Sequence, residues 1–360
     1  MVKIFSTKPS LPEFDALVSK METIYSATIL TNMGPLHNEF ETKLANYHNL
    51  DECCLINNAT MGLLLSLRAL GVSGEVITTP FSFAATTQVL KFLNLTPVFC
   101  DIQHDGPNID AEKIESLITA KTSAILATHC YGIPCDVDAI QDIADRNNLT
   151  VIYDAAHAFG QTVAGQSIFN FGDASVLSMH ATKVLNSVEG GAVFAKPKLM
   201  KELKAARNFG ITGEDQFDGV GINAKLSEIH AAFGLLNLEG VGDCLSKRRK
   251  IGEIYFDNIC NQVVTLIKPT DQTNYCYFPV CFSSVEKRDF VYENLRKNDI
   301  YARKYFSPLL CDDETVLERL SNAQNLVSRV LCIPIFPDLL EVEALRICQI
   351  INQSLKEISQ

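Results

Sequence analysis

The sequence has no excess of positive charge, since 31 Lys and Arg are outnumbered by 42 Asp and Glu and the formal net charge is −11. Because nucleic-acid backbones are bound through clustered Lys and Arg, nucleic acid is disfavoured as the main partner. No window approaches the roughly 20 apolar residues of a membrane span, and the N-terminus lacks the continuous apolar stretch of a signal peptide. We therefore expect a soluble, cytoplasmic protein without a membrane partner.

Two motifs with known chemistry are also missing. None of the 12 cysteines falls in a Cys-x-x-Cys pair, which indicates reduced, buried thiols rather than a disulfide or zinc scaffold. A zinc site at His129, Cys130 and Cys135 is disfavoured because neighbouring residues of a strand point in opposite directions, and we predict no metal. Without a Gly-x-Ser-x-Gly elbow, an open-sheet hydrolase is disfavoured as well.

Short apolar runs alternating with helical patterns are the main feature that is present. Nearly continuous apolar runs are typical of strands buried on both faces, and their alternation with helices predicts an α/β domain with a mostly parallel sheet. Seven such strands are expected, at 53–56, 75–79, 96–102, 123–129, 150–154, 174–180 and 191–195.

The rest of the chain divides in two. We predict a loop over 209–223 and one long helical pattern from Lys225 to about Cys260. Beyond it lie further strands and helices. The predicted domains are therefore 1–244, a large sheet domain, and 245–360, a smaller α+β domain.

Ligands of such sheets bind at the carboxyl ends of the strands, so the residues there come first. Residues 57–62 follow the first run and open a helix, which suits a phosphate through free N–H groups and the Thr60 hydroxyl. Capping of that helix by Asn58 or Thr60 is the simpler alternative. Phe83 follows the second run and could stack on a flat heterocycle or belong to the core.

Asp154 and Lys183 follow two other runs. A carboxylate at the base of an apolar site needs a cation or donor, such as a protonated pyridine nitrogen, although it could instead cap a helix. A lysine near an apolar sheet can have a lowered pKa and form a Schiff base, although an isolated lysine is mostly a surface charge. A phosphate loop, an aromatic, a carboxylate and a lysine together are what pyridoxal 5'-phosphate requires.

Several segments carry a resemblance to a known family. The chain resembles the DegT/DnrJ/EryC1/StrS sugar aminotransferases, which are pyridoxal-phosphate enzymes of the aspartate aminotransferase fold (fold type I). The segments that match are LTNMGPLHNEFE, NNATMGL, PFSFAAT, NIDAEKIESLI, THCYGIPCDVDAI, DAAHAFG, SMHATKVLNSVEGGA, GINAKLSEIHAAFGL and VLCIPIFP.

The resemblance assigns roles to individual residues. It implies that Lys183 forms the Schiff base, Asp154 pairs with the ring nitrogen, Phe83 stacks on the ring and His157 lies near the 3-hydroxyl. It further implies a homodimer whose composite site holds the phosphate through Thr60, the Met61 backbone, Ser178 and the partner copy's Asn223. His180 and Glu189 match the motif without a role. Family dehydratases carry His at the lysine position, so Lys183 favours amination.

The substrate is expected from smaller motifs. The motifs S-x-H-A-T-K, E-G-G, SGEVITTP and N-Y-x-Y-F-P resemble members that use L-glutamate to aminate C4 of a dTDP-linked 4-keto-6-deoxyhexose, for surface polysaccharides such as lipopolysaccharide O-antigen. The alternatives are amination at C3, amination at C4 with galacto configuration, and a catalytically silent regulatory partner. The cationic candidates for the nucleotide pyrophosphate are Arg249, in the run 247–250, and Arg303 and Lys304 beside Tyr305.

Overall fold

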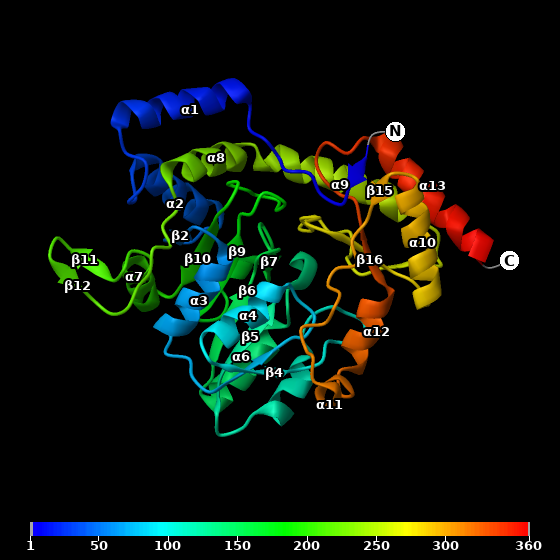
Figure 1. The fold of residues 1–360 in the computed structure, drawn as a ribbon, viewed down its shortest axis with the longest axis horizontal. Coiled ribbons are helices and arrows are strands. Elements are labelled where there is room, and N and C mark those ends of the chain that lie inside the picture. Colours follow the sequence, from blue (N-terminus) through cyan, green and yellow to red (C-terminus); the bar gives the residue numbers. More distant parts are fainter. Residues whose placement is uncertain (1–2, 359–360) are drawn as a thin grey trace.

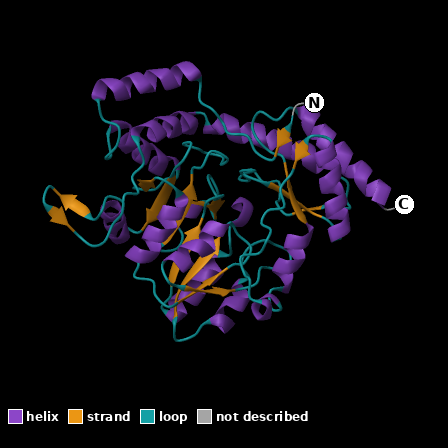
Figure 2. Ribbon diagram, viewed as in Figure 1, coloured by secondary structure: helices purple, strands orange, loops and turns teal. Residues whose placement is uncertain are grey.

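The computed structural model describes residues 3–358 and is built around a seven-stranded sheet (Figures 1 and 2). The strand order is β2-β10-β9-β6-β5-β3-β4, and only β10 runs antiparallel to its neighbours. The predicted mostly parallel α/β sheet is therefore confirmed. The strands are β2 Cys54–Ile56, β3 Glu75–Thr78, β4 Thr96–Phe99, β5 Thr122–Thr128, β6 Thr150–Asp154, β9 Ala174–Ser178 and β10 Gly191–Ala195.

Both faces of this sheet are buried in apolar cores. Val151 and Tyr153 of β6 belong to one core and Ile152 to the other, because successive side chains of a strand point to opposite faces. This two-sided burial explains the continuous apolar runs in the sequence. The first core is completed by α2 Pro35–Tyr47, α6 Val137–Asn147 and α8 Glu228–Glu239, and the second by α3 Ala59–Ala69, α4 Ala84–Phe92 and α7 Pro197–Ala206.

The C-terminal part has a core of its own. Its antiparallel sheet consists of β13 Val264–Thr265, β14 Phe278–Cys281 and β16 Val330–Ile333, and the core is completed by α9 Val241–Asn258, α10 Val285–Lys297 and α13 Glu341–Ile358. The N-terminal β1, Ile4–Phe5, pairs in parallel with β15, Ile300–Tyr301, so the start of the chain joins this part. The predicted boundary at 244/245 falls inside α9 and stays a prediction.

Three local features differ from expectation. The predicted helix over 225–260 is two helices, α8 and α9, which meet at Gly240, a residue with low helix propensity. The predicted loop over 209–223 contains a hairpin of β11 Ile211–Gly213 and β12 Gln216–Phe217, which projects beside α7 (Figure 1). Such short, exposed strands carry no alternating pattern that a sequence could reveal. The N-terminal α1, Phe14–Ala27, was not expected either.

The remaining elements are short. They are β7 Thr162–Val163, β8 Gln166–Ser167, α5 Ala111–Ile114, α11 Glu314–Leu317, α12 Ser321–Arg329 and three single turns of 3-10 helix, Glu115–Leu117, Cys130–Gly132 and Ile168–Asn170. Within residues 3–358 no helix has the length and apolar character needed to span a membrane. All 12 cysteines are free, and only Cys260 is not buried.

A close backbone contact fixes the start of α3 against the sheet. A Cβ on Gly191 of β10 would lie 2.7 Å from the Ala59 nitrogen and 2.8 Å from the Asn58 carbonyl carbon. Asn58 caps α3, and its Oδ1 accepts a hydrogen bond from the Met61 N–H at 2.9 Å. Only glycine at this position lets the helix N-terminus lie over the end of β10.

Gly191→Ala is expected to lower the free energy of unfolding by about 1–3 kcal/mol, because the added methyl group meets backbone atoms that cannot rotate away. The measurement is denaturant unfolding followed by circular dichroism. Gly242→Ala in α9 is the matched control, since a Cβ there meets no atom within 4 Å. Equal unfolding midpoints for the two variants would contradict the expectation.

Candidate active site

A cavity of about 300 Å³ opens at the carboxyl ends of β6 and β9. Residues of the C-terminal part also line it, namely Tyr277, Tyr305 and Phe306. Of the residues predicted from the sequence, the structure brings the following together here: Thr60, Phe83, Asp154, His157, Ser178, Lys183 and Tyr305. The site thus forms where the two parts of the chain meet.

Asp154 is the last residue of β6 and is 4% exposed. Its Oδ2 accepts a hydrogen bond from the Thr86 hydroxyl at 2.7 Å, and its Oδ1 accepts one from the Ala156 N–H at 3.2 Å. Burial raises the pKa of Asp154, while the hydrogen bonds from Thr86 and Ala156 and the charge of Lys183 oppose this shift. These hydrogen bonds hold the carboxylate in place, and among residues 3–358 it forms no ion pair.

Lys183 lies on the connection between β9 and β10. Both ends of this connection are fixed, because Ser178 pairs with Gly191 across the strands and the Met179 N–H donates to the Gly190 carbonyl at 2.8 Å. The amine of Lys183 donates to the Tyr277 hydroxyl at 3.3 Å. Burial lowers the pKa of Lys183, and the nearby Asp154 carboxylate partly counters this shift. A lowered pKa favours the free amine, which is the nucleophilic form.

Aromatic rings surround the lysine and the carboxylate. The His157 ring stacks on Phe306 with 5.6 Å between centroids and lies edge-on to Tyr277 at 4.9 Å. Its Nδ1 is buried and has no hydrogen-bond partner within residues 3–358. Phe83, by contrast, is 58% exposed and lines the same cavity.

The polar residues expected to hold phosphate differ in their contacts. The Ser178 hydroxyl accepts a hydrogen bond from the His180 N–H at 3.4 Å, and its own hydrogen remains available. Thr60 is exposed at the start of α3. The Met61 N–H already donates to Asn58 Oδ1, and the Met61 side chain lines a neighbouring cavity rather than this one. Asn58 thus caps the helix, as one of the two readings of this loop predicted.

Besides Met61, four predicted residues do not line this cavity. Asn223 is exposed and bridges to Asn208, and Arg249 forms an ion pair with Asp271 at 3.4 Å. Lys304 forms an ion pair with Asp289 at 2.5 Å. Arg303 contacts a residue of the site, since its guanidinium stacks on Tyr305 with 5.0 Å between the Cζ atom and the ring centroid.

Sequence reasoning missed Tyr277, Phe306 and Thr86 as parts of the site. Tyr277 belongs to the N-Y-x-Y-F-P motif, which in the sequence indicates only the substrate, and Phe306 follows the predicted Tyr305. Both lie far from Lys183 in the sequence, so their contact with the site could not be inferred from spacing. Thr86 lies three residues after Phe83 on α4, where the helical period would have pointed to it. His180 and Glu189, which had no role, line the cavity with 3.7 Å between His180 Nε2 and Glu189 Oε1.

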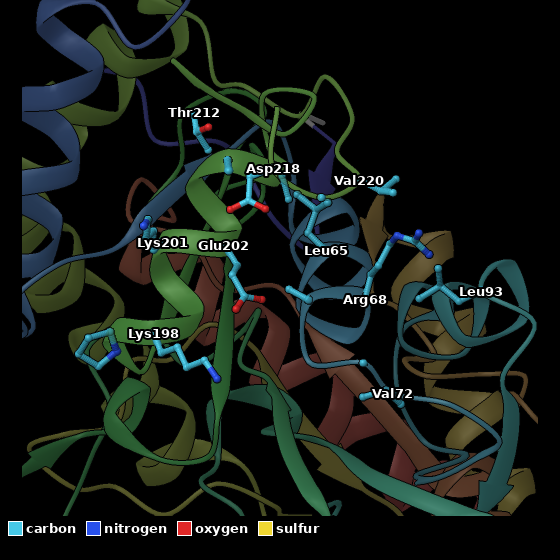
Figure 3. A pocket seen from close by; sticks show the side chains of 16 residues that line it. Leu65, Arg68, Val72, Leu93, Lys198, Lys201, Glu202, Thr212, Asp218 and Val220 are labelled. Atoms are coloured by element: carbon cyan, nitrogen blue, oxygen red, sulfur yellow. The ribbon is translucent and has the colours of Figure 1, made fainter. Parts of the chain in front are cut away.

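A second cavity, of about 760 Å³, lies between α3, α7 and the β11–β12 hairpin (Figure 3). Figure 3 shows Arg68 on α3 and Lys198, Lys201 and Glu202 on α7 around it. None of the predicted site residues lines this cavity. Among the described residues, no group of three or more His, Cys, Asp or Glu could hold a metal ion. The chemistry therefore concentrates in the cavity beside Lys183.

Comparison with known proteins gives the family. The model of the DegT/DnrJ/EryC1/StrS aminotransferase family matches residues 15–352. The chain belongs to this family. Two dTDP-4-amino-4,6-dideoxy-D-glucose transaminases are similar to it: one from Escherichia coli, 42% identical over 96% of the chain and 97% of that protein, and one from Shigella dysenteriae, 40% identical over 93% and 95%.

A solved structure of DesI in the presence of its TDP-sugar product has a TM-score of 0.92 and 30% sequence identity, covering 99% of this chain and 95% of DesI. The family prediction is confirmed, and with it the fold type I architecture, an aminotransferase activity and pyridoxal phosphate as cofactor.

The residues present fit this cofactor. A buried carboxylate, a lysine amine, an exposed aromatic ring and the hydroxyls of Thr60 and Ser178 line one cavity. The unpaired Nδ1 of His157 adds a buried polar atom that still needs a partner.

Tyr277→Phe is expected to lower the pKa of Lys183 further, because the phenol oxygen accepts a hydrogen bond from the amine and thereby favours its charged form. The measurement is the pH dependence of Lys183 acetylation in the cofactor-free protein, read by peptide mass spectrometry. The curve should move to lower pH. Tyr305→Phe is the control, since Tyr305 lines the same cavity; equal curves for both variants and the unmodified protein would refute the expectation.

Proposed function

We propose that the chain transfers the amino group of L-glutamate to C4 of a nucleotide-linked 4-keto-6-deoxyhexose, with dTDP as the nucleotide. The products are a 4-amino-4,6-dideoxyhexose and the oxo acid of the donor. The observation that carries the proposal is the placement of Asp154 and Lys183 on one cavity at adjacent strand ends.

Pyridoxal phosphate, when bound, supplies an electron sink for breaking a C–H bond at the amine-bearing carbon. In our proposal Lys183 carries the cofactor on its amine and moves protons, and its buried surroundings favour the neutral form that can accept them. Asp154 pairs with the ring nitrogen, where its hydrogen bonds from Thr86 and Ala156 hold it ionised.

The other cofactor contacts follow from the shape of the cavity. Phe83, which is exposed and lines the cavity, is proposed to stack on the ring, and the unpaired Nδ1 of His157 to lie near the 3-hydroxyl. Thr60, the Met61 backbone and Ser178 are proposed to hold the phosphate, aided by the positive end of the α3 dipole. Met61 would then share its N–H between the Asn58 cap and the phosphate.

We also propose a homodimer with a composite site. Asn223 is exposed and lies outside the cavity of its own chain, which suits a residue that completes the site of a partner copy. Exposed apolar side chains flank it on the same segment, namely Phe209, Phe217, Val220 and Ile222. Their burial between two copies would remove them from water.

The choice of substrate rests on the similarity to the two dTDP-sugar transaminases, with identities of 40% and 42% over nearly the whole chain. We assign the enzyme to the cytoplasm and its product to surface polysaccharide synthesis, such as lipopolysaccharide O-antigen. A catalytically silent regulatory role is disfavoured, since Lys183, Asp154 and Ser178 are all present at the cavity.

The direct test is incubation with L-glutamate and dTDP-4-keto-6-deoxyglucose. We expect NMR of the product to show nitrogen on C4 in the gluco configuration, and the visible absorption of the protein to shift when glutamate is added. Nitrogen on C3, or a galacto product, would overturn the assignment of the substrate.

Lys183→Ala should reduce turnover by at least about 100-fold, whereas Lys198→Ala, a lysine outside this cavity, should not.

Arg303→Ala is expected to raise the KM of the sugar nucleotide by about tenfold, because a hydrogen bond to a charged group is lost. The KM of glutamate should stay unchanged. Arg296→Ala is the matched control, since Arg296 also stacks on a tyrosine, with its Cζ atom 6.0 Å from the Tyr301 ring centroid. An unchanged KM for the sugar nucleotide in Arg303→Ala would remove this residue from the substrate site.

A further inference from the structure

We infer that Thr86, Ser82 and Thr128 form a chain of buried hydroxyl groups that positions the Asp154 carboxylate and holds it ionised. These three are positioning residues, because they act on the proposed cofactor contact through Asp154. The inference rests on the proposed function of Asp154.

The chain is continuous and buried. The Thr86 hydroxyl donates to Asp154 Oδ2 at 2.7 Å, and Ser82 Oγ lies 2.7 Å from Thr86 Oγ1 and 3.1 Å from Thr128 Oγ1. All four residues are at most 4% exposed. Three elements contribute: Thr128 ends β5, Ser82 follows β3, and Thr86 lies in the first turn of α4.

The direction of donation follows from the number of hydrogens. Each hydroxyl has one hydrogen to donate. Thr86 gives its hydrogen to the ionised Asp154, so Ser82 must donate to Thr86, and Thr128 must then donate to Ser82. All three O–H dipoles therefore point toward the carboxylate. Hydrogen bonds in such a chain polarise one another, which strengthens the bond that reaches the charge.

This arrangement opposes the effect of burial on Asp154. Two titratable groups interact with Asp154: Lys183, whose charge favours the ionised form, and the buried Cys130, whose pKa is raised chiefly by burial and in part by the Asp154 charge. His157 lines the same cavity, and burial together with the charge of Lys183 lowers its pKa. Within residues 3–358 no ion pair to Asp154 is found. The hydroxyl chain is thus a neutral means of stabilising a charge that the sheet would otherwise destabilise.

The variants are Thr86→Val, Ser82→Ala and Thr128→Val. Thr87→Val is the matched control, because Thr87 is the next residue of the same helix, is 2% exposed, and its hydroxyl has no hydrogen-bond partner within the described residues. In the reconstituted enzyme we expect kcat to fall by about tenfold or more for Thr86→Val and progressively less for Ser82→Ala and Thr128→Val, with unchanged KM for the sugar nucleotide. Thr86→Ser should restore most of the loss.

Stability against pH gives a second measurement that does not depend on activity. Removing a donor raises the folded-state pKa of Asp154 further above its unfolded value, so the variants lose stability at pH values above the folded pKa and not below it. The thermal midpoints of the cofactor-free Ser82→Ala and unmodified proteins should therefore differ at pH 7.5 and converge as the pH is lowered. In an Asp154→Asn background the difference should no longer depend on pH.

The outcomes separate this inference from the proposed function. If the unmodified enzyme aminates the keto sugar but Ser82→Ala and Thr128→Val match Thr87→Val in kcat and in the pH dependence of stability, the hydroxyl chain has no such role while the function stands. If the unmodified enzyme lacks turnover but the variants still show the pH-dependent loss of stability that Asp154→Asn abolishes, the function fails and the chain remains. A loss of stability in Ser82→Ala that is equal at all pH values would overturn the inference, since it would mark a packing defect alone.

Discussion

The structure depends on one costly arrangement, a carboxylate at the end of a strand that is buried on both faces. Ionised groups are expensive to bury without compensation, and within the part of the chain that the structure describes Asp154 forms no ion pair. The surrounding elements supply what it lacks. Helix α4 provides a hydroxyl, the turn after β6 provides an N–H group, and the segment before β14 provides the tyrosine that holds the nearby lysine. Much of the architecture around the site therefore keeps a carboxylate and an amine available for chemistry in an apolar setting.

The two parts of the chain have different tasks at this site. The sheet domain delivers the groups that act on a cofactor, because parallel strands bring their carboxyl ends to one edge. The C-terminal part adds Tyr277, Tyr305 and Phe306, which shield the site and contact the lysine and the histidine. Exclusion of water strengthens each electrostatic interaction inside.

The sequence predicted the features that depend on local pattern. Buried strands appear as apolar runs, and residues at their ends, such as Asp154, fall at the same edge by topology. Contacts made by separate segments could not be read in this way, which is why Tyr277 and Phe306 were missed. The break at Gly240 was missed because apolar periodicity continues across it, although a glycine with low helix propensity stood there. The β11–β12 hairpin was not predicted because its side chains are mostly exposed and do not alternate between apolar and polar residues.

The antiparallel course of β10 has a mechanical consequence for the lysine. Since β9 and β10 are adjacent in the sheet, the connection that carries Lys183 leaves and re-enters neighbouring strands, and both of its ends are tied by main-chain pairing. The segment that carries the reactive amine is thus held at both of its ends by the central sheet. The residues between β9 and β10 can therefore vary in number or type while the ends of both strands keep their positions. Such variation would change the surroundings of the amine and leave the sheet unchanged.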